Sequence, residues 1–230
     1  MNPNLAFIIF SIGVAGLFFL NRDNSVRTSP ALWLPVMWLW IVGSRPVSSW
    51  FDMGSTSGSV LDATLEGSPM DAAVFAALLG LGILVLLYRR KITSAYLALS
   101  GPIIFYFVYC LLSVAWSPFH EPSFKRWTKA VGDLVMVLVI LTDGQPIAAL
   151  RRVYSRVGFI LFPYSVFMIR YTVTGRGYDP DGNPENVGLT SNKNSLGLIV
   201  FVISLGVLWN MLWLLRHKDE PHRGRRLVAQ

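Results

Sequence analysis

The sequence is poor in charge, in cysteine and in residue clusters that bind metals. Only 14% of its 230 residues are Asp, Glu, Lys or Arg, whereas soluble domains average roughly 25%. The shortfall excludes an ordinary soluble domain, because most of the chain has no water to face. The single cysteine, Cys110, cannot form an internal disulfide and so indicates no redox compartment. Without a paired-cysteine or His-rich pattern, we expect neither a metal nor a cofactor.

The N-terminus also lacks the pattern of a cleavable signal peptide. Met1-Asn2-Pro3-Asn4 has no basic start. The apolar run that follows ends at Asn21-Arg22-Asp23 and not at a small-residue cleavage site. We therefore expect this run to be a retained helix.

Long apolar runs are what the sequence has in abundance. Hydrophobic residues make up 53% of the chain, and the mean hydropathy is +0.50. A helix needs roughly 17–25 residues to span a membrane. The predicted fold is an all-α integral membrane protein, a polytopic bundle of about seven transmembrane helices within residues 1–215. The predicted helices are 5–20, 31–43, 72–88, 96–116, 130–142, 157–171 and 196–215. For 31–43, 130–142 and 157–171, a tilted, re-entrant or longer helix stays open.

The basic residues predict the orientation in the membrane. With the N-terminus outside and seven alternating helices, the inner segments hold 13 of the 20 Lys and Arg residues, and the outer segments hold seven. This bias follows the positive-inside rule, so the net charge of +7 is explained without nucleic acid. We expect a periplasmic N-terminus and a basic cytoplasmic tail at 216–230. Six of the seven outer basic residues lie near loops 117–130 and 170–195, which favours a negatively charged ligand at the outer membrane surface.

The first outer loop predicts a basic helix at the interface. If Ser123 is its N-cap, Lys125 and Lys129 share one helix face. Trp127 suits the headgroup level. The alternative to a ligand site is an interfacial helix that contacts anionic lipid, with Lys129 paired to Asp133.

The second outer loop, from Thr174 to Ser195, is rich in Gly, Pro, Asn and Asp, which favour turns. It leads directly into the last apolar run. We expect Asn194 or Ser195 to be the N-cap, so that backbone N–H groups and the positive end of the helix dipole face outward beside Lys193. The pattern indicates an anion site at the lipid surface, and the alternative is an ordinary polar loop before a capped helix.

Several stretches in these loops resemble the O-antigen ligase and polymerase family. They are Trp116-Ser117-Pro118, Phe124-Lys125-Arg126-Trp127, Gly132-Asp133-Leu134, Gly175-Arg176-Gly177-Tyr178 and, most specifically, Gly188-Leu189-Thr190-Ser191-Asn192-Lys193-Asn194-Ser195-Leu196-Gly197. Two others, Ser44-Arg45-Pro46 and Glu66-Gly67-Ser68-Pro69, look like bacterial exopolysaccharide-production members. The resemblance implies a bacterial inner-membrane glycosyltransferase of lipopolysaccharide or exopolysaccharide biosynthesis, acting on glycans attached to undecaprenyl pyrophosphate.

A pyrophosphate at the outer leaflet requires cations and backbone donors at headgroup depth. We assign its binding to Lys125, Arg126, Arg176 and Lys193, with Asn192, Asn194 and Lys129 in support. The expected partners are a lipid-linked oligosaccharide and membrane lipids. A separate C-terminal half or other polysaccharide-assembly proteins are further expected partners.

The resemblance covers only part of the family pattern. Members usually have more helices, and their catalytic His and Arg lie in a large periplasmic loop of the second half, to which nothing here corresponds. We therefore expect a truncated protein, half of a split protein or a chain that is inactive alone, and the catalytic residues stay unassigned. The alternative is a small polytopic transporter or a lipid-linked-glycan binding protein without catalysis. If the chain is active, His120 and Asp179 or Asp181 are the first acid–base candidates.

Overall fold

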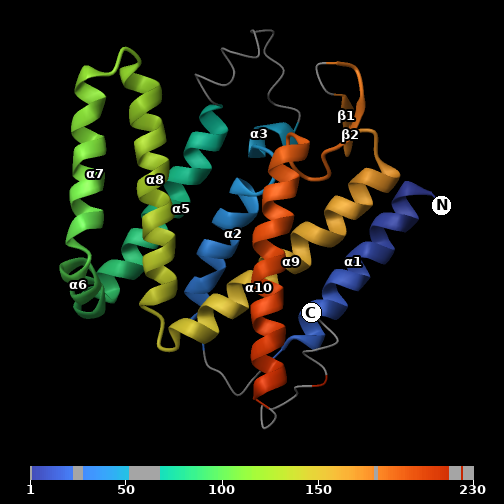
Figure 1. The fold of residues 1–230 in the computed structure, drawn as a ribbon, viewed down its shortest axis with the longest axis horizontal. Coiled ribbons are helices and arrows are strands. Elements are labelled where there is room, and N and C mark those ends of the chain that lie inside the picture. Colours follow the sequence, from blue (N-terminus) through green and yellow to red (C-terminus); the bar gives the residue numbers. More distant parts are fainter. Residues whose placement is uncertain (1, 23–27, 52–67, 179–180, 218–223, 225–230) are drawn as a thin grey trace. The chain divides into compact units, whose positions relative to one another are not determined.

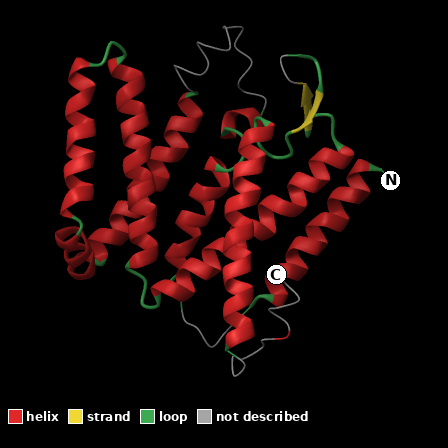
Figure 2. Cartoon of the chain, in the orientation of Figure 1, coloured by secondary structure: helices red, strands yellow, loops and turns green. Residues whose placement is uncertain are grey.

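The computed structural model describes all residues except 1, 23–27, 52–67, 179–180, 218–223 and 225–230 (Figure 1). The described part is almost entirely helical, with one two-stranded sheet (Figure 2). The chain divides into two compact units. Unit 1 contains Met1–Thr28, Leu39–Arg45 and Ile147–Gln230, and unit 2 contains Ser29–Trp38 and Pro46–Pro146.

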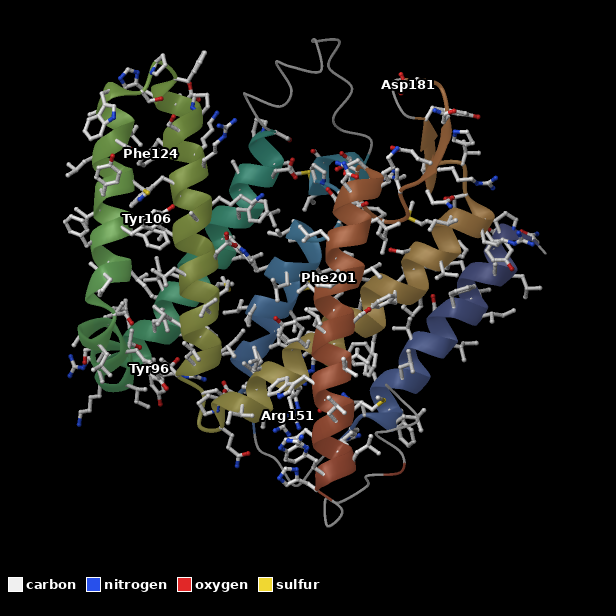
Figure 3. All side chains as sticks on the ribbon, viewed as in Figure 1. Tyr96, Tyr106, Phe124, Arg151, Asp181 and Phe201 are labelled. Atoms are coloured by element: carbon white, nitrogen blue, oxygen red, sulfur yellow. The ribbon has the colours of Figure 1, made fainter. Side chains whose placement is uncertain are left out.

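Unit 1 is built from three long helices and a small hairpin: α1 (Pro3–Leu20), α9 (Pro146–Tyr171), α10 (Lys193–Arg216), β1 (Arg176–Tyr178) and β2 (Pro184–Asn186). Aromatic side chains join α1 to α9, because the rings of Phe7 and Phe10 each lie 5.7 Å from the ring of Phe167. The guanidinium carbon of Arg151 on α9 lies 3.5 Å from the ring centre of Trp213 on α10 (Figure 3). Aromatic packing and a cation–π contact thus hold the three helices together.

Unit 2 contains α3 (Val47–Trp50), α5 (Pro69–Tyr88), α6 (Arg90–Leu99), α7 (Gly101–Ser113) and α8 (His120–Leu141), with the short 3-10 helices η1 (Pro30–Leu32) and η2 (Val114–Trp116). The start of α2 (Trp33–Val42) also belongs to it. Its core lies where α2, α5 and α8 meet. The buried core residues are Trp38, Leu86, Val135, Met136, Leu138 and Val139.

In the described residues, three helices, α1, α5 and α10, are long and apolar enough to cross a membrane. The number rises to four if α6 and the α7–η2 helix form one broken span. Only 6%, 11% and 22% of the apolar stretches of α1, α5 and α10 are buried within the chain. Such large exposed apolar surfaces are typical of segments that lie in lipid. The count of seven spans stays a prediction.

The predicted helix over 96–116 is wrong as a single straight helix. It is two helices that meet at Ser100 with a bend of 85°. The cause is local, because Pro102 has no backbone N–H to continue a helix from the preceding turn. The apolar segment at 31–43 is a short helical segment, Pro30–Val42.

Two further helices begin earlier than their apolar runs. The helix predicted at 130–142 begins at His120, and the one predicted at 157–171 begins at Pro146. Both predicted caps are also wrong. Ser123 lies inside α8, and the N-cap of α10 is Asn192, because its Oδ1 accepts a hydrogen bond from the Ser195 backbone N–H at 2.8 Å. Most of the predicted 216–230 tail lies outside the described residues.

Candidate functional site

Arg45 anchors the loop between α9 and α10 in unit 1. Its Nε donates to the carbonyl oxygen of Thr190 at 3.0 Å, and its Nη2 donates to those of Gly188, at 3.3 Å, and Thr174. Burial lowers the pKa of Arg45 from its ordinary value, but a guanidinium keeps its charge at neutral pH. One charged side chain therefore fixes two loop segments, one on each side of the hairpin.

The first part of the segment that leads into α10, residues 187–190, is buried and structural. Gly188 has φ of +56°, and a Cβ added there would come within 3.0 Å of Ser165. The Ser165 hydroxyl accepts a hydrogen bond from the Leu189 backbone N–H at 3.4 Å. The Thr190 hydroxyl lies 2.7 Å from the carbonyl oxygen of Val187. Residues 187–190 are all buried, whereas 191–194 are exposed.

The exposed part of the segment forms the start of α10. Asn192 caps the helix, and the Lys193 ammonium lies 3.3 Å from the Glu185 carboxylate. A cation at a helix N-terminus is repelled by the helix dipole, so Glu185 offsets an unfavourable position. The backbone N–H of Asn194 donates to no group in the described part of the chain.

The hairpin separates the two cations predicted in this loop. Arg176 pairs with Asn186, and Gly177 pairs with Glu185. Because neighbouring residues of a strand point to opposite faces, Arg176 lies on one face and Glu185, with Lys193, on the other. Asp181 lies in the turn between the strands (Figure 3), and Asp179 lies outside the described residues.

In unit 2, the first turns of α8 carry the other predicted cations. The Lys125 ammonium lies 2.7 Å from Glu121, and this contact lowers the pKa of the Glu121 carboxyl below its ordinary value. The Lys129 ammonium lies 5.1 Å from the ring centre of Phe75 on α5. His120 begins α8, and its Nε2 lies 3.1 Å from the carbonyl oxygen of Ala115 in η2.

The predicted ion pair between Lys129 and Asp133 is wrong. Asp133 instead accepts a hydrogen bond of 2.6 Å from the indole Nε1 of Trp38. The reason is the packing of α2 on α8, since a Cβ added at Gly132 would overlap the Trp38 ring. This close approach brings the indole N–H to the next residue of α8.

The Arg126 side chain has different surroundings from the side chains of Lys125 and Lys129. It lines a cavity of about 280 Å³ between α7 and α8. The other lining residues are Tyr106, Phe107, Cys110, Ser113, Val114, Ser123, Trp127 and Ala130. Lys125 and Arg126 belong to unit 2, whereas Arg176 and Lys193 belong to unit 1. The convergence of all four at one site stays a prediction.

A second polar network, which the sequence did not predict, joins the C-terminal ends of α5 and α8 in unit 2. The Arg89 guanidinium lies 3.6 Å from Asp143, whose side chain is only 1% exposed. Arg89 also donates to the Thr142 hydroxyl at 3.3 Å. The Ser29 backbone N–H donates to Asp143 at 3.1 Å. Thr142-Asp143, directly after an apolar run, is the one sequence signal for this network.

Comparison of the chain with protein-family models, with curated proteins and with solved structures gives no match.

Proposed function

We propose that the chain is a membrane protein of the O-antigen ligase and polymerase type, which binds a lipid-linked pyrophosphate glycan at the outer face of a bacterial inner membrane. The sequence resemblance of the two polar loops supports this proposal, as do the apolar helices beside them. The observation that carries it is the division of the 188–194 segment. A buried anchor, 188–190, is followed by an exposed tip, 191–194, at the start of α10.

The exposed tip has the chemistry that a phosphate group requires. It offers a hydroxyl, two amide side chains, an ammonium group and the backbone N–H of Asn194. Anions bind well at helix N-termini, because backbone N–H groups and the dipole both favour negative charge. Since α10 is apolar from Leu196 onward, the tip is expected at headgroup depth.

The Glu185–Lys193 pair suggests how the ligand enters. In the structure, the Lys193 ammonium is paired with the Glu185 carboxylate. A pyrophosphate competes more strongly for this ammonium, because it carries more charge and can accept hydrogen bonds from several donors. We assign Asn192 and Asn194, which flank Lys193 in the exposed tip, to the same ligand in support. Arg126 is left out of this set, because its side chain lines the cavity between α7 and α8.

A lipid-linked-glycan binding protein without catalysis is the second candidate. One observation favours it: the exposed tip, Ser191-Asn192-Lys193-Asn194, contains neither a carboxylate nor an imidazole. Binding the ground state without stabilising the transition state does not accelerate transfer. Formation of product separates the two candidates.

The test is a titration of the purified chain in lipid nanodiscs with an undecaprenyl-pyrophosphate-linked oligosaccharide. Lys193→Gln should weaken binding about two- to fivefold, the change expected for one solvent-facing charge. Glu185→Gln should strengthen binding, because Lys193 loses its competing carboxylate. Lys91→Gln is the matched control, since Lys91 is exposed on α6 and is predicted on the cytoplasmic side. Equal losses for Lys193→Gln and Lys91→Gln would rule out this site.

A further inference from the structure

Arg126 combines two features that point to a ligand. Its side chain lines the cavity between α7 and α8. It also makes no hydrogen bond, ion pair or ring contact with any residue that the structure describes. Its two basic neighbours differ, since Lys125 is paired with Glu121 and Lys129 lies over the ring of Phe75. Arg126 is exposed, so its unpartnered guanidinium at this aromatic-walled cavity is available to an anion.

The cavity runs along the two helices from a polar end to an apolar end. Ser113 and Ser123 lie at the end near the α7–α8 connection, and Ala130 lies two turns further along α8. This distance is about 10 Å at the rise of an α-helix. The Trp127 indole N–H donates to the carbonyl oxygen of Phe107 at 3.0 Å, which fixes the aromatic wall. Tryptophan is enriched at the membrane interface, so the polar end is expected at headgroup depth.

We propose that this cavity binds an anionic phospholipid, with its phosphodiester at Arg126 and the first part of an acyl chain along Tyr106, Phe107 and Trp127. The charges match, because one guanidinium balances the single negative charge of a phosphodiester. A volume of about 280 Å³ is at the small end of ligand pockets, which are roughly 300–1,000 Å³. It therefore holds the phosphate and a short stretch of chain, with the rest of the lipid in the bilayer. The inference is independent of the proposed glycan function.

Cys110 supplies a native probe, because it lines the cavity and is the single cysteine of the chain. The full chain is purified in a neutral detergent and titrated with phosphatidylglycerol or with phosphatidylcholine of the same acyl length. Alkylation of Cys110 by N-ethylmaleimide is then followed by intact-mass spectrometry. Phosphatidylglycerol should slow alkylation at about tenfold lower concentration than phosphatidylcholine, as expected for one charge-assisted contact.

Three variants make the result specific to Arg126. Arg126→Gln should abolish the preference for phosphatidylglycerol, and Arg126→Lys should retain part of it, because the charge remains. Lys91→Gln, which removes an exposed cation of α6 that does not line the cavity, should leave the preference unchanged. Equal protection by both lipids, or a preference that survives in Arg126→Gln, would overturn the proposal. So would stronger protection by undecaprenyl phosphate than by phosphatidylglycerol, which would assign the cavity to the glycan lipid.

Discussion

Removing the Arg45 guanidinium should open the loop between α9 and α10 without unfolding the helices. Arg45→Ala deletes three hydrogen bonds to the carbonyl oxygens of Thr174, Gly188 and Thr190. A hydrogen bond from a charged donor contributes about 1.5–3 kcal/mol. Arg45 is half-buried, and the three bonds are not additive. We therefore expect the free energy that favours the closed loop to fall by about 2–4 kcal/mol.

This loss should appear as faster amide hydrogen exchange. Val187, Gly188 and Thr190 all donate backbone hydrogen bonds within the loop region, to Gly175 and to Val187. A loss of 2–4 kcal/mol corresponds to exchange that is about 30-fold to several hundred-fold faster. Exchange in the helices should change little, because loops open locally at lower free energy than helical cores.

Two variants serve as comparisons for Arg45→Ala. Arg45→Lys keeps the charge but lacks the planar fork, so its effect should be intermediate. Arg176→Ala removes an exposed arginine of the same unit whose side chain bonds to no described residue, and loop exchange should stay near the wild-type rate. Unchanged protection of Gly188 and Thr190 in Arg45→Ala would refute the anchoring role.

Three other predictions concern the rest of the chain. Asp143→Asn should lower the stability of unit 2 by about 3 kcal/mol, because it leaves the Arg89 charge without its partner, and Arg89→Met in the same chain should recover part of the loss in a thermal melt. Gly132→Ala should destabilise unit 2 by about 1–3 kcal/mol through overpacking against the indole ring of α2, whereas Gly80→Ala, with open space around its Cα, should not lower the melting temperature. Reporter fusions within 216–230 should be active only on the cytoplasmic side, and periplasmic activity would reverse the predicted orientation.

The apolar runs identified where helices lie, because membrane-compatible composition is a local property of the sequence. Their ends were harder to predict. The basic stretch after Ser123 was expected as a separate helix at the interface, yet it belongs to one helix that runs from His120 to Leu141. Helical hydrogen bonds depend on backbone geometry, and polar residues such as Lys and Arg are good helix formers. The break at Ser100 had a local signal in Gly101-Pro102, but it is hidden inside one apolar run.

The contacts at the candidate sites depend on tertiary packing, which the spacing of residues along the sequence does not reveal. Four-residue spacing favoured Lys129 as the partner of Asp133, but Trp38, 95 residues away in sequence, is the partner. Arg45 stood out in the sequence only within Ser44-Arg45-Pro46, and its partners lie 129 to 145 residues along the chain. Contacts of this kind depend on tertiary packing, so the anchoring of the loop was not predictable from the spacing of residues along the chain.

Photo-crosslinking tests the proposed glycan site most directly. An undecaprenyl-pyrophosphate oligosaccharide with a photoreactive group on its first sugar would be bound to the full chain in nanodiscs, irradiated and mapped by peptide mass spectrometry. We predict crosslinks within 188–195 that are lost in the presence of excess unlabelled glycolipid. Crosslinks confined to the predicted cytoplasmic segments, or insensitive to competition, would contradict the account.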